Sequence, residues 1–166
     1  MATTTDKISY VATAAVITCT LNSLASSSTA GRGSAAVDNT TNLYDDALVE
    51  VILKTAATTT PANDKAGYVY IYGSADGTNY DGSSNENVGT DAAVTIDAPT
   101  NLKGPVVLVL LNSNASYKTS FSVARFFGGV MPLKWGVVVQ NFSGMVLTGT
   151  PSDHSVTYTG IYYTNS

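Results

Sequence analysis

Residues 67–73 read Gly-Tyr-Val-Tyr-Ile-Tyr-Gly, and residues 133–140 read Leu-Lys-Trp-Gly-Val-Val-Val-Gln. β-Branched and aromatic residues, which are enriched in β-strands, make up most of both stretches. Because successive side chains of a strand point to opposite faces, Val69 and Ile71 share one face of the first stretch and its three tyrosines share the other. Both stretches therefore predict strands of a β-sheet.

The same alternation recurs along the chain. Residues 105–112 are apolar on both faces, which is typical of a central strand, and Pro105 stands at the first position, where a proline is tolerated. Turn dipeptides such as Asp76-Gly77 separate the runs, and no segment has the spacing of an amphipathic helix. The further predicted strands cover residues 17–24, 47–55, 92–97, 117–127 and 154–163, and residues 145–148 extend the 133–140 strand after a bend.

This series of strands predicts an all-β fold: an antiparallel β-sandwich of about eight strands with jelly-roll-like connections. A closed barrel is the nearest alternative, because strand order cannot be read from one sequence. We expect residues 16–166 to form a single sandwich domain, and residues 1–15 to form an N-terminal arm or an edge strand. Residues 25–45 and 74–91 are expected to be long irregular loops.

The composition excludes several classes of protein. Hydrophobic residues make up 44% of the chain and charged residues only 12%, which argues against a disordered chain and against a helical bundle with charged solvent faces. Eight scattered basic residues and a net charge of −4 argue against binding to nucleic acid. The longest apolar run, residues 106–111, is far shorter than the ~20 residues of a membrane span. We therefore expect no contact with nucleic acid or membrane.

The chain has one cysteine, Cys19, which cannot form an internal disulfide. It stands between Ile17 and Leu21 on the inward face of a predicted strand, so we expect a small buried apolar side chain rather than a reactive thiol. The first residues show no basic segment followed by an apolar run, which indicates that no signal peptide is present. These features predict synthesis and folding in a cytoplasm.

Side chains suited to catalysis are scarce. The only histidine, His154, lies beside Asp153 just before a predicted strand, and we expect it to be a surface residue in a turn. Most of the ten aspartates stand in turn contexts, where their side chains bind the local backbone. Residues 76–82 offer oxygen atoms to calcium but depart from the EF-hand pattern, so a turn is the favoured interpretation. The sequence thus predicts no catalytic residue, no metal site and no cofactor.

The chain has ten tyrosines beside only four phenylalanines. Tyrosine combines an apolar body with a polar tip and is enriched at protein interfaces. Internal packing and stacking on carbohydrate are the alternatives for the tyrosine row. The candidate interface combines tyrosines with apolar residues of the N-terminal segment: Ile8, Tyr10, Val11, Tyr68, Tyr70, Tyr72, Tyr158, Tyr162 and Tyr163.

Three stretches carry a resemblance to a known class of protein. Residues 68–80 (Tyr-Val-Tyr-Ile-Tyr-Gly-Ser-Ala-Asp-Gly-Thr-Asn-Tyr) and residues 121–136 (Phe-Ser-Val-Ala-Arg-Phe-Phe-Gly-Gly-Val-Met-Pro-Leu-Lys-Trp-Gly) resemble small virion structural proteins of tailed bacteriophages. Residues 154–163 (His-Ser-Val-Thr-Tyr-Thr-Gly-Ile-Tyr-Tyr) are similar to them too. These stretches cover about a quarter of the chain.

The resemblance implies a non-enzymatic virion component made in the cytoplasm of a bacterial host. A capsid decoration (cement) protein on the outside of the head is expected first, with the major capsid protein as its partner. A neck, tail or fibre component is the alternative in the same class, and a carbohydrate-binding β-sandwich module is the alternative from another class. The excess of tyrosine beside few charges predicts a homo-oligomer, and the resemblance implies a trimer.

Overall fold

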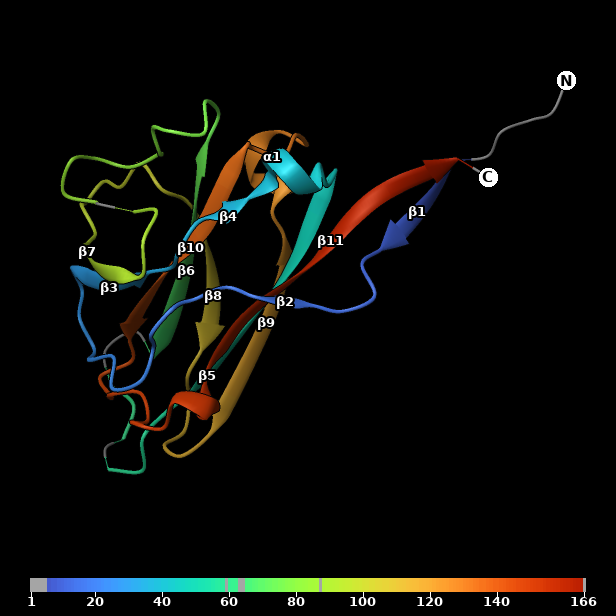
Figure 1. Ribbon diagram of the computed structural model, residues 1–166. Coiled ribbons are helices and arrows are strands. Elements are labelled where there is room, and N and C mark those ends of the chain that lie inside the picture. The colour runs from blue at the N-terminus through green and yellow to red at the C-terminus, as the bar shows by residue number, and fades with distance from the viewer. Residues whose placement is uncertain (1–5, 59, 63–64, 87, 166) are drawn as a thin grey trace, which may run out of the picture.

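The computed structural model describes residues 6–58, 60–62, 65–86 and 88–165, which fold into two antiparallel β-sheets packed face to face (Figure 1). The predicted all-β sandwich is confirmed. It contains eleven strands in the described residues, rather than about eight. No helix among these residues is long and apolar enough to cross a membrane.

Sheet A contains five strands, and sheet B contains six. The order in sheet A is β1 (Asp6–Tyr10), β11 (Ser155–Asn165), β5 (Asp46–Lys54) and β9 (Ser116–Ser122), and β2 (Ala15–Val16) also pairs with β11. The order in sheet B is β7 (Ala92–Thr95), β3 (Ala30–Gly33), β10 (Lys134–Phe142), β6 (Ala66–Ser74) and β8 (Lys103–Val109), and β4 (Val37–Asp38) also pairs with β10. The helical pieces are α1 (Asn39–Asn42), η1 (Ala124–Phe127) and η2 (Pro151–Asp153).

The core between the sheets is formed by alternate residues of the central strands. On β6, Val69 and Ile71 point into it and are fully buried, as the alternation predicts. The same rule places Trp135 of β10 and Val49 of β5 in this core. The strands predicted at residues 47–55, 67–73, 92–97, 105–112, 133–140 and 154–163 all correspond to observed strands, with shifted ends.

A second, smaller core lies on the outer face of sheet B, under the loop that joins β6 to β7. Residues 75–91 contain no named strand in their described part, which agrees with the predicted loop. This loop and the segment after β7 bury one end of sheet B, whereas the other end of that outer face stays open. The buried residues of the second core are Tyr72, Val88, Val94, Ile96, Leu102 and Val138.

The strand predicted at residues 17–24 is wrong. Ile17 and Leu21 are buried as expected, but no named strand runs through this segment. The backbone N–H of Thr20 donates to a carboxylate oxygen of Asp91 at 2.9 Å, not to a neighbouring strand. A segment with alternating burial therefore need not pair as a β-strand, because side chains can accept the hydrogen bonds of its backbone N–H groups.

The loop predicted at residues 25–45 is also wrong, because it contains β3, β4 and α1. Gly31 and Gly33 stand in this predicted loop, yet both lie within β3. A Cβ atom at Gly31 would lie 2.8 Å from the carbonyl oxygen of Val139, and one at Gly33 would lie 2.9 Å from a methyl of Val94. The glycines mark a close approach of strands instead of a chain reversal.

Two further predicted strands are shorter than expected or absent. The strand at residues 117–127 ends at Ser122, because the carboxylate of Asp46 accepts hydrogen bonds from the Ser122 hydroxyl and the Ala124 N–H and so starts the turn η1. Residues 145–148 contribute only an isolated bridge between Leu147 and Thr55.

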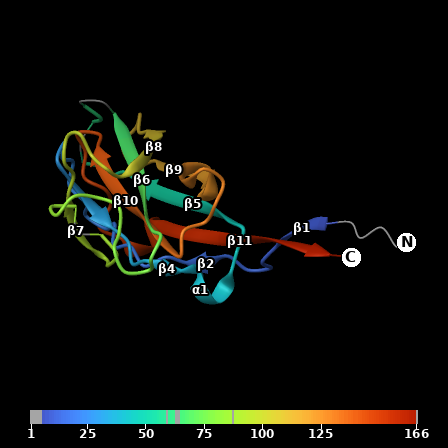
Figure 2. The ribbon, with the colours of Figure 1, turned by 90° about the horizontal axis from the view of Figure 1, so that it is seen from above.

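Strand β11 is longer than the sheet that it belongs to. Residues 155–161 pair with β5, whereas residues 161–165 pair with β1. This second half of β11 and β1 form a two-stranded ribbon that leaves the sandwich, with residues 6 and 165, the first and last described, at its tip (Figures 1 and 2). Within the predicted arm or edge strand of residues 1–15, residues 6–10 are thus strand β1, and residues 1–5 lie outside the described residues.

Candidate functional site

The three tyrosines of β6 lie on the outer face of sheet B but differ in exposure. Tyr68 and Tyr70 are half-buried, whereas Tyr72 is fully buried in the second core. The Tyr72 hydroxyl donates to the carbonyl oxygen of Ser34 at 2.7 Å, and burial raises the pKa of Tyr72 well above its ordinary value. Tyr72 was expected at an interface, and its burial corrects that expectation.

Next to Tyr68 and Tyr70, the outer face of sheet B is open and apolar. Tyr68 is paired directly with Val107 of β8, and Val107 and Val109 expose 50% and 56% of their surface. β8 is the edge strand of sheet B. We call Tyr68, Tyr70, Val107 and Val109 the β8 patch; an exposed apolar edge of this kind is a site where proteins associate.

The ribbon carries most of the other candidate interface residues. Ile8 is opposite Tyr163, and Tyr10 is opposite Ile161, so these four side chains share one face, the ribbon face. Ile8, Tyr10 and Tyr163 are 58%, 59% and 61% exposed. Tyr162 is exposed on the opposite face of the ribbon. Val11, half-buried, lies at the base of the ribbon, where its N–H donates to the carbonyl of Gly160 at 2.9 Å.

Tyr158 is half-buried and packs against the core, and its role at an interface stays a prediction. Its ring meets Trp135 edge to face at a centroid distance of 5.4 Å and meets Tyr44 in the same way at 6.4 Å. Burial raises the pKa of Tyr158. Its remaining accessible surface lines a shallow groove of about 310 Å³ beside β2 and β4.

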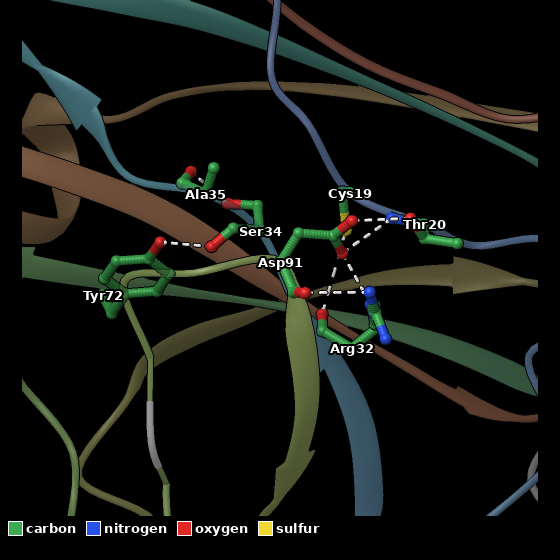
Figure 3. Close-up of polar contacts among 7 residues, drawn as sticks. All are labelled: Cys19, Thr20, Arg32, Ser34, Ala35, Tyr72 and Asp91. Atoms are coloured by element: carbon green, nitrogen blue, oxygen red, sulfur yellow. Dashed lines mark hydrogen bonds and ion pairs between the residues drawn. The ribbon is translucent and has the colours of Figure 1, made fainter.

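A polar cluster around Asp91 joins three segments that are distant in sequence (Figure 3). The Arg32 Nε lies 2.6 Å from the Asp91 carboxylate, and the Arg32 Nη2 donates to the Asp91 carbonyl at 2.9 Å. Thr20 donates both its N–H and its hydroxyl to the same carboxylate. Partial burial alone would raise the pKa of Asp91, but the hydrogen bonds from Arg32 and Thr20 outweigh it and bring the pKa down to about 2. The cluster therefore holds the 17–24 segment against sheet B.

Acid is expected to weaken this cluster. An aspartate has a pKa near 3.9 in an unfolded chain, and Asp91 has a pKa of about 2 in the folded protein. Its stabilising contribution is therefore complete above about pH 4 and is lost as the pH falls toward 2. Asp91→Asn should reduce the free energy of unfolding by about 1–3 kcal/mol at pH 7, and by much less at pH 2.

The measurement is urea denaturation of both proteins across this pH range. Arg32→Ala supplies the control, because in its background Asp91→Asn should have a smaller effect at pH 7. An Asp91→Asn effect of equal size at pH 7 and pH 2 would contradict the assignment.

His154 is buried, which corrects the expectation of a surface histidine. Its Nδ1 accepts a hydrogen bond from the Lys54 N–H at 3.3 Å, and its Nε2 lies 3.0 Å from the carbonyl oxygen of Thr148, so the neutral ring carries its proton on Nε2. Asp153 forms an ion pair with Lys54 at 3.1 Å and does not orient the imidazole. The histidine thus closes a structural junction between β5 and η2.

The remaining reactive groups are also occupied by structural contacts. Burial, followed by the nearby Asp91 charge, raises the pKa of Cys19 to about 12, so its thiol stays protonated at neutral pH. The Asp76 carboxylate accepts hydrogen bonds from Asn79, Thr78 and Ser74, which hold its pKa well below the ordinary value. Across the described ranges, no three His, Cys, Asp or Glu residues lie close enough together to hold a metal ion.

Sequence reasoning missed one apolar groove of about 350 Å³ between η1 and β10. Val130 and Leu133 are exposed at its rim. The signal for it was present, since an apolar run follows Gly128-Gly129 directly, outside any predicted strand. The groove is lined by Ala75, Phe127, Val130, Met131, Pro132 and Leu133.

The chain was compared with family models, with curated proteins and with solved structures, and none of the three comparisons found a match. The candidate site therefore depends on geometry alone. It consists of two exposed apolar surfaces, the ribbon face and the β8 patch. The titratable groups described above make structural contacts within the sandwich.

Proposed function

We propose that this chain is a non-enzymatic structural protein of a bacteriophage virion, and that it binds the outside of the capsid as a decoration (cement) protein. The observation that carries the proposal is the ribbon, which projects from a well-packed sandwich and exposes Ile8, Tyr10 and Tyr163 (Figure 1). Such a surface suits contact with another protein better than chemistry on a small substrate. The partner is the major capsid protein, and the sequence resemblance supplies the virion context.

The jelly-roll-like connectivity belongs to the same proposal. The chain passes from one sheet to the other between β2 and β3, between β4 and β5, and between β5 and β6. It passes between the sheets again at the β8–β9, β9–β10 and β10–β11 connections. Repeated crossing of this kind supports a Greek-key arrangement of the jelly-roll type.

The position of the protein on the virion is tested with purified particles of the virus that encodes it. An antibody against the recombinant protein should label the surface of the heads in immunogold electron microscopy. Label confined to the neck, tail or fibres would establish the alternative role in the virion, and particles free of the protein would refute the proposal.

A chain that begins at residue 12 is expected to keep its melting temperature within a few degrees and to lose binding to particles. Strand β1 pairs only with the projecting half of β11, so its removal leaves the sandwich pairs of β11 with β5 intact. Calorimetry measures the first effect, and co-sedimentation with particles depleted of the protein measures the second. Val16→Thr, at an exposed residue outside the ribbon, is the control that should bind normally.

Carbohydrate binding is the second candidate. Tyr68 and Tyr70 lie side by side on an open sheet face, with ring centroids 6.4 Å apart, and aromatic faces of this kind can stack on sugar rings. A glycan array distinguishes the two functions. Specific glycan binding that Tyr68→Ala and Tyr70→Ala abolish would favour the binding module over the virion role.

A further inference from the structure

The ribbon is an incomplete piece of sheet. Its two strands pair with each other over residues 6–10 and 161–165, and among the described residues no third strand flanks this stretch. A two-stranded ribbon is only marginally stable in water unless something packs on it. Ile8, Tyr10 and Tyr163 expose more than half of their surface there. Among the residues that the structure describes, nothing therefore covers the ribbon face.

The outer face of sheet A continues onto the ribbon. Over the sandwich this face carries Glu50, which forms an ion pair with Lys118 at 2.5 Å, and Thr157 beside it. Beyond residue 160 the same face carries Ile161 and Tyr163. Exposed Val16 and Leu48 lie on this face over the sandwich as well, so its apolar surface continues onto the ribbon, where the protein's own core cannot use it.

The β8 patch has the size and chemistry to cover the ribbon face. It too is two strands wide, and it lies at the open edge of sheet B. Lys65 and Lys103 stand at its two ends, and Lys103 forms a long ion pair with Asp81 of the same chain at 3.8 Å. The acidic Asp45, whose carboxylate accepts the Tyr163 N–H at 2.9 Å, stands beside the ribbon. The basic Lys7 is on the opposite face of the ribbon, away from such a contact.

The two surfaces cannot meet within one molecule. The ribbon extends sheet A away from the sandwich, whereas the β8 patch lies on the outer face of sheet B, which points away from sheet A (Figures 1 and 2). Their complementary charge and matching width can therefore be used only between copies.

We propose that the ribbon face of one copy packs on the β8 patch of a second copy of this chain. The contact is heterologous, so it produces a closed ring if the rotation between copies closes and a filament if it does not. This contact specifies how copies of the proposed virion protein associate with one another, and it does not depend on the capsid. Failure of the experiment below would leave the virion role to be decided by the particle labelling.

The proposal is tested by light scattering and sedimentation of the purified full chain and two double variants. Tyr10→Thr with Tyr163→Thr alters the ribbon face, and Val107→Thr with Val109→Glu alters the β8 patch. The wild type should form oligomers at micromolar concentration, and each double variant should associate at least about 30-fold more weakly, as expected for loss of central apolar contacts. Val16→Thr is the matched control and should associate like the wild type, and the melting temperatures of monomeric variants report whether they fold.

Mixing the two double variants gives the decisive result. Each variant retains the surface that the other has lost, so a heterologous contact predicts two-chain species in the mixture and monomers in each separate sample. A wild type that stays monomeric, or a patch variant that associates like the wild type, would overturn the proposal. Association that depends on the ribbon residues alone would replace it with a ribbon-to-ribbon contact.

Disulfide trapping supplies an independent check. Chains with Tyr163→Cys and chains with Val107→Cys should form a mixed disulfide under mild oxidation, far faster than either chain forms one with itself. Both chains also carry Cys19→Ser, so that the partly buried native thiol takes no part in the exchange. Equal rates in the mixed and separate samples would contradict the contact.

Discussion

Trp135→Ala is expected to reduce the free energy of unfolding by about 3–5 kcal/mol, the range for removal of a large buried side chain. Trp135 is fully buried between the two sheets, where it lies opposite Gly73 of β6 and meets the Tyr158 ring edge to face. The cavity cannot close easily, because the flanking Val137 is held in the central strand β10. Urea denaturation measures the loss. The curves of the wild type and the variant are fitted with one common m-value, the slope of the free energy of unfolding against urea concentration.

Two variants sharpen this test. Trp135→Phe should destabilise less than alanine does, since it keeps a ring in the core and removes an indole N–H that has no hydrogen-bond partner among the described residues. Leu133→Ala, two residues away and partly exposed, is the matched control and should cost less than about 1 kcal/mol. Similar losses for Trp135→Ala and Leu133→Ala would show that the inter-sheet core is packed differently.

Glu86→Ala is expected to open the loop between β6 and β7 and to reduce the free energy of unfolding by about 3 kcal/mol, because buried donors lose a charged acceptor. Glu86 is almost completely buried. Its carboxylate accepts hydrogen bonds from the backbone N–H of Ser83 at 2.9 Å, from the N–H of Asp97 at 3.1 Å and from the Thr100 hydroxyl. One side chain therefore joins the loop to the segment that follows β7.

Hydrogen exchange followed residue by residue separates this local effect from global unfolding. The amides of Ser83 and Asp97 should lose protection by a larger factor than those of β10 at the centre of sheet B. Glu86→Gln keeps one carbonyl oxygen and should give an intermediate loss. Unchanged protection at Ser83 and Asp97 in Glu86→Ala would show that the carboxylate does not hold the loop.

The strands that the sequence predicted well share one property. Each has a row of alternating side chains that faces the core, as in β5, β6 and β10. The errors have the opposite cause. The glycines of β3 lie inside a strand because neighbouring atoms of other strands leave no room for a Cβ. Residues 17–24 bury Ile17 and Leu21 without forming a named strand, because their backbone groups bond to several separate partners, among them Val156, Ala35 and Asp91. Both depend on residues distant in sequence.

The candidate interface shows the same division. The alternation correctly placed Tyr68, Tyr70 and Tyr72 on one face of β6, but only Tyr72 lies beneath the long loop and is fully buried. The half-buried position of Tyr158 and the buried position of His154 likewise follow from contacts with Trp135 and Lys54, which no local pattern contains.

The sequence by itself determined that this protein is all-β with few groups suited to catalysis, because side-chain alternation and composition are properties of the chain. The choice between a sandwich and a closed barrel came from the strand order of the two sheets. The tertiary structure alone decided which apolar residues remain outside. Ile8 and Tyr163 are far apart in the sequence, and they share an exposed face only because β11 continues past the end of β5 and takes β1 as its partner. Burial depends on contacts between distant segments, so exposure, and with it the surface available to a partner, becomes defined only when the chain has folded.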